Sequence, residues 1–538
     1  MQKITCHFDK AQYLPGEPVR LILPENSASP SVTFFRMERE TELRAVWQDG
    51  ALVLTDVPPG GYGVRVSTLD GVWEGAFDVV SDRRAEIRYG FLSDFSPLDT
   101  DTADVEWMRD LHINAVQFYD WMYRHDRLLP PGERYDDPMG RPTDLRVITR
   151  KIEACKSCGI RPLAYGAVYA ATKDTFEEHP EWGMYTMDAQ PMTFAGWLYY
   201  MNIAPSCGWA AHIVEEFRSA VRFGFSGIHM DTYGFPKRVW DAQRQPVELA
   251  GEFPRLIHAA AQAVREEAPD GGVIFNAVNN WPTETVAGTE QDAVYIEVWS
   301  PHDTYFDLYR LIREARLLSH RNVILAAYLK AFQTADTPAA ERSFRLAWAV
   351  ISASGGTQLV LGEDRSLLRD SYYVNYARLR ESFLPTVQRC CDFLVRYKDL
   401  LYNDPGMDIS KTASGGINED VRFFSDKCAF STDGQADTVW TILRESRERL
   451  TLHLVNLTGN NALWNEGKRE PVPAAGISAA IRLDRPVRGI YCASPDDETL
   501  AARSLPYTAE QTEAGCIYTV KLPDVRYWTA VWVQLEDR

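Results

Sequence analysis

Eight short apolar runs alternate with helix-like stretches through residues 86–400, and this alternation limits the choice of fold more than any other feature of the sequence. The runs are rich in Val, Ile, Leu and Phe and do not alternate strictly with polar residues, as expected of strands buried on both faces. We predict strands at 87–93, 115–120, 162–167, 227–231, 273–278, 294–299, 323–328 and 358–363. Helices are predicted at 103–111, 143–158, 208–222, 252–267, 304–318 and 340–353, with a last helical stretch at 371–400.

Strand–helix units of this number and length predict a central (β/α)8 TIM barrel. A doubly wound open sheet is the competing fold, but no G-x-G-x-x-G follows a strand, which disfavours its dinucleotide-binding form. Two connections are long, 121–142 after the second strand and 168–207 after the third, and both would lie at the C-terminal, functional face of the barrel. The link between residues 278 and 294 is short, and its helix is left undecided.

The two ends of the chain have the pattern of β domains. In residues 1–85, short strand-like runs are separated by the turn clusters L-P-G-E-P and V-P-P-G-G-Y-G, which predicts an immunoglobulin-like β-sandwich. Residues 401–538 return to strand patterns such as R-L-T-L-H-L-V-N-L and W-T-A-V-W-V-Q-L, which predicts an antiparallel, Greek-key-like C-terminal domain. We therefore predict a multidomain chain divided at 1–85, 86–400 and 401–538.

Charge and composition narrow the class of partner. A net charge of −18 and a pI of about 5.1 argue against a nucleic-acid surface. Aromatic residues make up 12% of the chain, which fits a carbohydrate site because ring faces pack against sugar C–H groups, although the core of a large barrel would also hold many rings. We find no apolar run of membrane-spanning length and no signal peptide, which predicts a cytoplasmic protein, or a secreted one if a leader has been removed. No sequence feature defines an oligomeric state.

The cysteines and histidines give little support to a metal site. The nine cysteines are scattered, which indicates reduced thiols, and the C-x-x-C at Cys155 and Cys158 has no second pair. His229 lies at a strand end, but no His is found at another strand end to share a metal with it. We predict no cofactor and no catalytic metal. A structural Ca²⁺ ion in a loop stays an open alternative, but the sequence contains no D-x-D-x-D-G pattern that would locate it.

Acidic residues gather where the predicted strands end. Catalytic side chains of a TIM barrel stand at the C-terminal ends of its strands. Five of these eight positions hold an acid; the eight are Asp94, Asp120, Tyr165, Asp231, Asn276, Glu297, Tyr328 and Glu363. Glycoside hydrolysis needs two carboxyl groups that flank one bond. Asp231, on the fourth strand, would be the nucleophile, and Glu297, on the sixth, the longer-reaching acid/base. The structural alternatives are a loop cap for Asp231 and a buried ion pair for Glu297.

Four sequence motifs indicate which family of enzymes the chain resembles. R-Y-G-F-L-S-D-F, N-A-V-Q-F-Y-D-W-M-Y-R-H, G-F-S-G-I-H-M-D-T-Y-G and Y-I-E-V-W resemble glycoside hydrolase family 66, which contains dextranases and cycloisomaltooligosaccharide glucanotransferases. The resemblance covers most of the chain and implies a retaining enzyme acting on α-1,6-glucan. It makes Asp231 the nucleophile, Glu297 the acid/base and Asp120 the acid that holds the sugar in the −1 subsite. The family's transferases carry an inserted carbohydrate-binding module that this sequence lacks, so hydrolysis of dextran or isomaltooligosaccharides is expected rather than cyclisation.

The remaining candidates are residues that would bind the carbohydrate substrate. The proposed stacking rings are Tyr119, Trp121, Tyr165, Tyr169, Trp281, Trp299 and Tyr328. The proposed partners of sugar hydroxyls are Asn276, His229, His125 and Glu363. Two alternatives to hydrolysis stay open: transglycosylation, in which a sugar hydroxyl replaces water, and a non-catalytic glucan-binding barrel. The linkage itself is not fixed by the fold or by the acids.

Overall fold

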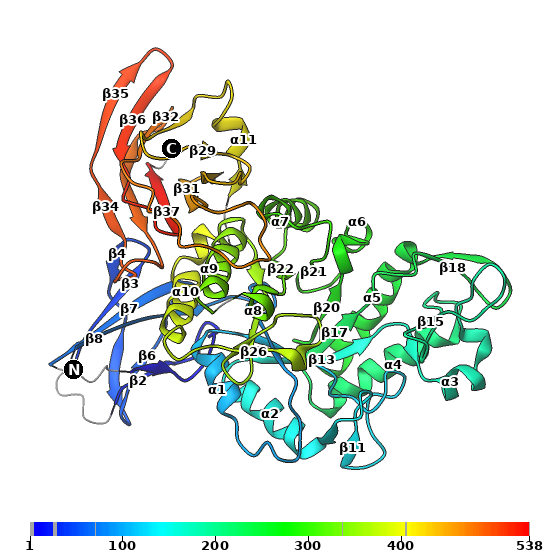
Figure 1. Ribbon diagram of the computed structural model, residues 1–538. Coiled ribbons are helices and arrows are strands. Elements are labelled where there is room, and N and C mark those ends of the chain that lie inside the picture. Colours follow the sequence, from blue (N-terminus) through cyan, green and yellow to red (C-terminus); the bar gives the residue numbers. More distant parts are fainter. Residues whose placement is uncertain (1–4, 25–29, 70, 336, 404–405, 537–538) are drawn as a thin grey trace.

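A curled parallel sheet forms the centre of the molecule (Figure 1). The computed structural model describes residues 5–24, 30–69, 71–335, 337–403 and 406–536. Seven strands pair in parallel in the order of the sequence: β9 (Tyr89–Leu92), β10 (Ala115–Phe118), β13 (Arg161–Ala167), β17 (Gly227–Asp231), β20 (Gly272–Asn276), β21 (Val294–Glu297) and β22 (Val323–Ala326). Each lies within a predicted strand or within two residues of one.

The eighth predicted strand is divided into two short pieces. β23 (Thr357–Gln358) pairs with β22, and β24 (Leu361–Gly362) pairs with β9 through Gly362 and Phe91. One stretch of six residues, 357–362, therefore joins the last strand of the parallel sheet to the first. The sheet curls round on itself at this point.

Helices follow the strands as the sequence predicts, with two differences. The confirmed helices are α1 (Ala103–Asp110), α2 (Leu145–Ser157), α4 (Gly208–Phe223), α5 (Leu249–Glu267), α7 (Tyr305–Ser319) and α9 (Thr337–Ala353). Between β20 and β21 lies the single turn α6 (Thr283–Val286). The predicted helix 371–400 is wrong over its first part: α10 (Leu384–Arg396) begins only where Pro385 can occupy the first turn. Residues before it form β26 (Ala377–Arg378), which pairs with β25 (Ser366–Leu367).

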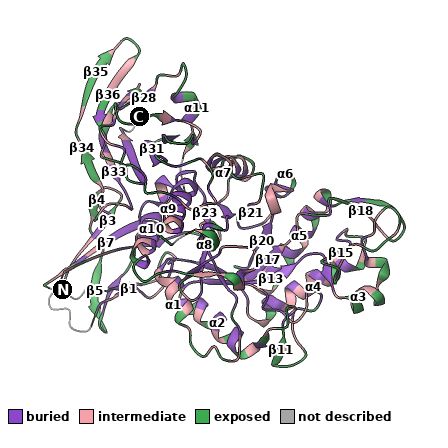
Figure 2. Cartoon of the chain, in the orientation of Figure 1, coloured by how far each residue is buried: buried purple, intermediate pink, exposed green. Residues whose placement is uncertain are grey.

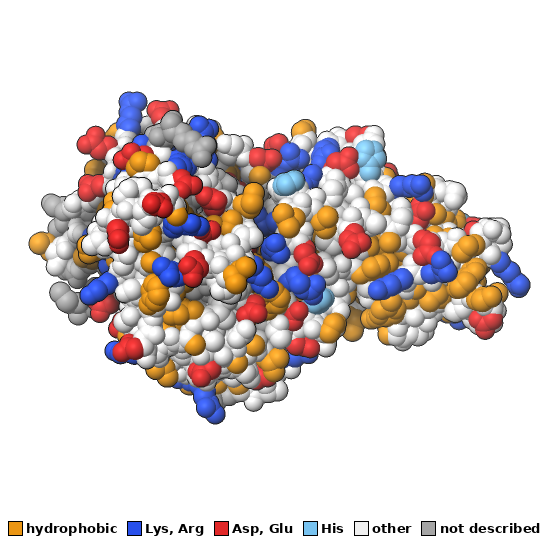
Figure 3. All heavy atoms as spheres, turned by 90° about the horizontal axis from the view of Figure 1, so that it is seen from above, with side chains coloured by type: hydrophobic (Ala, Val, Ile, Leu, Met, Phe, Trp, Pro, Cys, Tyr) orange, Lys and Arg blue, Asp and Glu red, His pale blue; other side chains and the backbone are white. Residues whose placement is uncertain are grey.

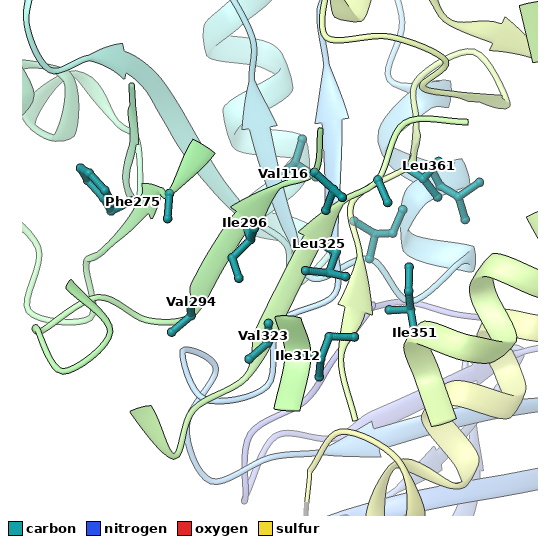
Figure 4. Close-up of a cluster of buried hydrophobic side chains, with 14 of the residues drawn as sticks. Val116, Phe275, Val294, Ile296, Ile312, Val323, Leu325, Ile351 and Leu361 are labelled. Carbon is teal, nitrogen blue, oxygen red and sulfur yellow. The ribbon is translucent and has the colours of Figure 1, made fainter. Parts of the chain in front are cut away.

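Alternate residues of the parallel strands point to opposite sides of the sheet. In Figure 4, Ile296 and Leu325 lie on the side of the helices, where Ile312 of α7 and Ile351 of α9 belong to the same buried cluster. The neighbouring side chains Tyr295 and Ile324 belong to a separate buried cluster inside the curl, together with Tyr89, Phe91, Leu163 and Ile274. Figure 2 shows this central region almost wholly buried. Glu297 follows Tyr295 by two residues, so the pleat turns its side chain to the inside.

Two antiparallel sheets precede the central sheet. One has the order β1 (His7–Phe8), β2 (Val19–Ile22), β6 (Ala51–Leu54), β5 (Ala45–Gln48), and the other β4 (Arg39–Thr41), β3 (Ser31–Arg36), β7 (Gly60–Thr68), β8 (Gly71–Val79). They share a buried cluster that includes Phe8, Tyr62 and Phe77. The aromatic and β-branched residues of these strands meet between the two sheets, as in a sandwich.

Two further sheets follow the central one. The first has the order β27 (Met407–Asp408), β30 (Val439–Glu445), β31 (Arg449–Asn456), β37 (Trp528–Leu535), β33 (Val487–Ala493), β34 (Arg503–Leu505), with β29 (Phe430–Ser431) beside β30. The second has the order β28 (Val421–Phe424), β32 (Ser478–Leu483), β36 (Gly515–Lys521), β35 (Tyr507–Thr512). Across the described ranges, none of the helices has the length and apolar character needed to cross a membrane.

The long connections after β10, β13 and β17 fold into small structures of their own. The first carries the hairpin β11 (Arg134–Asp136) and β12 (Pro142–Asp144). The second carries α3 (Lys173–Glu178) and a small sheet of β14 (Ala170–Ala171), β16 (Leu198–Tyr200) and β15 (Thr193–Phe194). The third carries β18 (Arg238–Trp240) and β19 (Pro246–Glu248), and a bridge from Tyr185 to Trp240 joins it to the second (Figure 1).

Candidate active site

A cavity of about 310 Å³ opens where the parallel strands end. Ten of the residues predicted from the sequence line it: Tyr119, Asp120, His125, Tyr165, His229, Asp231, Asn276, Glu297, Trp299 and Tyr328. They come from β10, β13, β17, β20, β21 and β22 or from the first residues after these strands, except His125, which lies in the long connection after β10. The pleat and the curl of the sheet therefore bring together side chains that are more than two hundred residues apart in sequence.

Asp231 is held at the end of β17 by the alternation of that strand. Ile228 and Met230 pack toward the helices, so His229 and Asp231 point into the cavity. At the start of the strand, a Cβ on residue 227 would overlap the carbonyl oxygen of Gly272, so only glycine lets β17 and β20 approach this closely. The carboxylate of Asp231 accepts hydrogen bonds of 2.7 Å from the Tyr165 hydroxyl and the Asn276 amide.

Glu297 lies at the end of β21, across Asn276 from Asp231. It accepts hydrogen bonds from the Asn276 amide at 3.0 Å and from the Tyr328 hydroxyl at 3.1 Å. The same amide nitrogen thus donates to both carboxylates, which fixes the orientation of the Asn276 side chain because its oxygen would be repelled there. The two acids are held on either side of one small, uncharged group.

Burial dominates the electrostatics of the two acids. It raises the pKa of Asp231 to about 6, against the opposing hydrogen bonds from Asn276 and Tyr165. It also raises the pKa of Glu297 to about 7, and the negative charge of Asp231 adds to this effect. The pair can therefore hold one proton near neutral pH, with Glu297 protonated and Asp231 ionised.

A third acid, Asp120, follows β10 in the left-handed backbone region, with a φ of 51°. Its carboxylate lies 4.0 Å from the Arg141 guanidinium, which is itself held by Asp137 at 2.6 Å. Burial raises the pKa of Asp120 to about 7, and Arg141 opposes the shift. Asp120 is therefore a buried acid on the same wall as Tyr119, with one partly exposed cationic neighbour.

Aromatic and imidazole rings surround the acids. The Tyr119 and Tyr373 rings stack with centroids 4.3 Å apart, and the rings of Trp299 and Tyr328 lie 5.8 Å apart. Burial lowers the pKa of His229 to about 3 and that of His125 to about 4, so both imidazoles are neutral at neutral pH. Neutral rings with N–H groups suit an uncharged, hydroxyl-rich ligand.

Four predicted binding residues do not line the cavity, and two of them are aromatic residues buried behind it. Trp121 is fully buried and donates from its indole N–H to the Tyr165 carbonyl at 3.1 Å. Tyr169 donates to the Phe235 carbonyl at 3.1 Å and accepts from the backbone N–H of Tyr233 at 2.7 Å. Both support the walls of the cavity from outside, because the chain turns away after the strand end and points these rings into the surrounding core.

The other two are displaced by the loops that carry them. Trp281 packs edge-on against Phe253 of α5, with ring centroids 5.8 Å apart. Glu363 accepts hydrogen bonds from the backbone N–H and hydroxyl of Ser93, at 2.8 and 2.5 Å, and from the backbone N–H of Asp94 at 3.0 Å. Glu363 therefore ties β24 to the loop after β9 and does not line the cavity.

The cavity also contains residues that the sequence did not indicate: Gln117, Met139, Phe194, Trp197, Leu198, Thr232, Tyr233, Val278, Tyr295, Ser371 and Tyr373. Gln117 and Tyr295 have the same strand parity as Tyr119 and Glu297, and this parity would have identified them. Most of the others come from the loops after β10, β13, β17 and β24, whose placement depends on long-range pairing. No group of three or more His, Cys, Asp or Glu suited to a metal ion is found in the part of the chain that the structure describes.

Sequence comparison decides the family. The sequence model of glycosyl hydrolase family 66 matches residues 8–532. The chain belongs to glycosyl hydrolase family 66. The resemblance seen in the strand-end motifs is thereby confirmed.

The relatives within this family are distant in sequence. A cycloisomaltooligosaccharide glucanotransferase of Niallia circulans is 24% identical over 98% of this chain and 72% of its own length. A dextranase of Streptococcus salivarius is 22% identical over 88% of this chain and 67% of its own. The crystal structure of a cycloisomaltooligosaccharide glucanotransferase from Paenibacillus sp., complexed with cycloisomaltoheptaose, superposes with a TM-score of 0.88 over 98% of this chain and 99% of that one, at 21% identity. Family and relatives together support an enzyme that acts on glucans.

Proposed function

We propose that this family 66 protein is a retaining glycoside hydrolase that cleaves the α-1,6-glucosidic bonds of dextran or isomaltooligosaccharides. Asp231 is the nucleophile and Glu297 the acid/base. The observation that carries the proposal is the shared hydrogen-bond donor, Asn276, which contacts both carboxylates at the mouth of the curled sheet.

The shared donor limits the distance between the two carboxylate oxygens that it contacts. The two oxygens that Asn276 contacts cannot be further apart than the sum of 2.7 and 3.0 Å, which is about 5.7 Å. Retaining glycosidases hold their carboxyl groups about 5–5.5 Å apart, whereas inverting enzymes leave about 6.5–9.5 Å for a water molecule. The geometry therefore favours direct attack by Asp231 over attack by an activated water.

In the first step, protonated Glu297 gives its proton to the glycosidic oxygen while an oxygen of Asp231 attacks the anomeric carbon. The glycosidic C–O bond breaks, the leaving sugar departs as an alcohol, and a glycosyl ester of Asp231 forms. In the second step, ionised Glu297 takes a proton from water, and the water oxygen attacks the anomeric carbon. The ester C–O bond breaks, which regenerates the Asp231 carboxylate and protonated Glu297. The higher pKa of Glu297 fits the order of these roles.

The other polar groups of the cavity would bind the sugar. Asp120 is proposed to accept hydrogen bonds from hydroxyls of the glucose unit in the −1 subsite, and His125 and His229 to pair with neighbouring hydroxyls. Tyr119, Tyr165, Trp299 and Tyr328 form the aromatic surfaces against which sugar rings would pack. Tyr165 and Tyr328 also orient the two catalytic acids.

The architecture proposed around this site is a (β/α)8 barrel between two β domains. The closure of β22, β23, β24 and β9 through residues 357–362 supports the barrel. The proposed boundaries are 1–85 for an immunoglobulin-like sandwich, 86–400 for the barrel and 401–538 for an antiparallel C-terminal domain. In such a barrel the cavity lies at the functional face.

Transglycosylation is the second candidate, and the glucanotransferases among the relatives favour it. The chemistry differs only in the second step, where a sugar hydroxyl replaces water. The alignment with the Niallia transferase runs over 711 positions against the 538 residues of this chain, so at least 173 positions lie opposite gaps. The alignment with the dextranase runs over only 572 positions. We therefore place hydrolysis first.

The test is a product profile on dextran, isomaltotriose and maltotriose, run on the wild type and on Asp231→Gly and Glu297→Gln. We expect cleavage of the α-1,6 substrates alone and loss of activity in both variants. Full activity in both variants would refute the assignment of the acids. Cyclic or longer products would favour transglycosylation, and binding without turnover would favour a non-catalytic glucan-binding barrel.

A further inference from the structure

An exposed tryptophan stands at the edge of the catalytic cavity. Trp197 lies between β15 and β16, with 41% of its surface exposed, and it also lines the cavity. The other aromatic residues of the lining are buried or half-buried. The ring therefore has an open face beside the cavity, on which the C–H face of a ligand can pack.

The hairpin holds Trp197 in a defined place. Ala195 and Gly196 both have positive φ, 52° and 79°, and the Trp197 N–H donates to the Phe194 carbonyl at 3.2 Å, which makes a tight primed turn. β16 pairs with β14, which follows β13 closely in sequence. The tryptophan therefore sits on a short, hydrogen-bonded platform that is joined to the central sheet.

Ring contacts connect the hairpin to the catalytic strand. Phe194 stacks on Tyr233 with centroids 4.4 Å apart, and Tyr233 follows Asp231 by two residues. The rings of Phe235 and Phe194 have centroids 6.1 Å apart, and Phe235 is 50% exposed, so this row of rings includes a second exposed aromatic residue. Figure 3 shows hydrophobic side chains gathered over the end of the molecule where Figure 1 places β15 and β18.

The small volume of the cavity explains why a longer glucan would contact exposed rings at its rim. At about 310 Å³ it lies at the lower end of the range of ligand pockets, about 300–1,000 Å³. A longer glucan must therefore leave the cavity over its rim. The C–H faces of neutral sugars pack on exposed indole rings, and the binding does not depend on the protein's charge.

We propose that Trp197 is the platform of an outer subsite, which binds one glucose unit of an α-glucan chain at the rim of the catalytic cavity and makes the enzyme prefer longer chains. Phe194 anchors the turn because its carbonyl accepts the Trp197 N–H, and the exposed ring of Phe235 lies beside Phe194. The inference rests on the proposed function, because it takes the glucan to be the substrate of the acids beside it.

The test compares Trp197→Ala with Trp47→Ala on a short and a long substrate, isomaltotriose and isomaltoheptaose. Trp47 is a matched control because it is also exposed, by 50%, but lies on β5 of the N-terminal sheets. For Trp197→Ala we expect the KM for isomaltoheptaose to rise about tenfold, with kcat/KM for isomaltotriose within about twofold of wild type. Trp197→Phe should restore most of the loss, and Trp47→Ala should change neither substrate.

The outcomes separate this inference from the proposed function. If the wild type cleaves neither isomaltooligosaccharide, the proposed function is wrong, and the proposed outer subsite is refuted together with it. If the wild type cleaves both and Trp197→Ala leaves both KM values unchanged, or raises them equally, the outer subsite is refuted while the catalytic assignment stands. Equal thermal unfolding of the three variants shows that the KM values compare intact folds.

Discussion

Replacing Asn276 by alanine removes the amide that donates to both catalytic carboxylates. Each of these hydrogen bonds stabilises an ionised carboxylate and lowers its pKa, so the substitution raises the pKa of Asp231 and of Glu297 together. Asp231 must be ionised to attack, so the acidic limb of the pH–rate profile moves to higher pH. Glu297 must be protonated to act as an acid, so the alkaline limb moves in the same direction.

The size of the shift follows from the strength of the bonds. A hydrogen bond to a charged group contributes about 1.5–3 kcal/mol, and one pKa unit corresponds to about 1.36 kcal/mol. Starting from limbs near pH 6 and pH 7, each limb should move up by about one to two units. The whole bell-shaped pH–rate profile is therefore displaced to higher pH, and its width stays about the same.

The assay is kcat/KM for isomaltotriose measured across pH, because this parameter reports the ionisation of the free enzyme. The two limbs are macroscopic values of the coupled pair, and the prediction concerns their common displacement. Limbs that move in opposite directions in Asn276→Ala, or an unmoved profile, would refute the reasoning that one amide holds both acids.

Three further substitutions separate the contributions of single groups. Tyr165→Phe removes a donor from Asp231 alone, so the acidic limb of kcat/KM should rise while the alkaline limb stays; movement of the alkaline limb instead would contradict this. Tyr328→Phe removes a donor from Glu297 alone, so only the alkaline limb should rise, measured in the same way. Glu363→Ala leaves three hydrogen-bond donors of the loop after β9 without their acceptor, and we expect the free energy of unfolding in urea to fall by about 3 kcal/mol. A loss below about 0.5 kcal/mol would show that Glu363 is not a structural tie.

The strands that carry the acids could be predicted because their evidence is local. The run 227–231 is apolar, bounded by glycine, and ends in Asp231, and the structure gives β17 the same bounds. The alternation within each strand then decides which side chains face the inside. For the same reason, Gln117 and Tyr295 could have been predicted from the sequence. Each lies two residues before a predicted cavity residue, Tyr119 or Glu297, and its side chain therefore points to the same side of the sheet.

The positions of the residues that were misplaced or missed depend on structure outside the predicted strands. Trp121 comes directly after Asp120, whose left-handed backbone turns the chain and sends the next side chain into the core. Trp197 reaches the cavity only because β16 pairs with β14 and β15 across the loop after β13. The pairing of β14 with β16 joins Ala170 to Tyr200, and a contact between residues this far apart leaves no periodic signal in the sequence.

The central claim is that Asp231 forms a covalent bond with the sugar, and the most direct measurement is to trap that bond. The enzyme is incubated with a 2-deoxy-2-fluoro-glucosyl fluoride. This compound forms the ester with the enzyme quickly, and the ester hydrolyses slowly. The labelled enzyme is then digested, and its peptides are examined by mass spectrometry. We predict that the sugar is found on the peptide that contains Asp231, at that residue. A label on another carboxylate, or an unlabelled enzyme that releases products of inverted anomeric configuration, would contradict it.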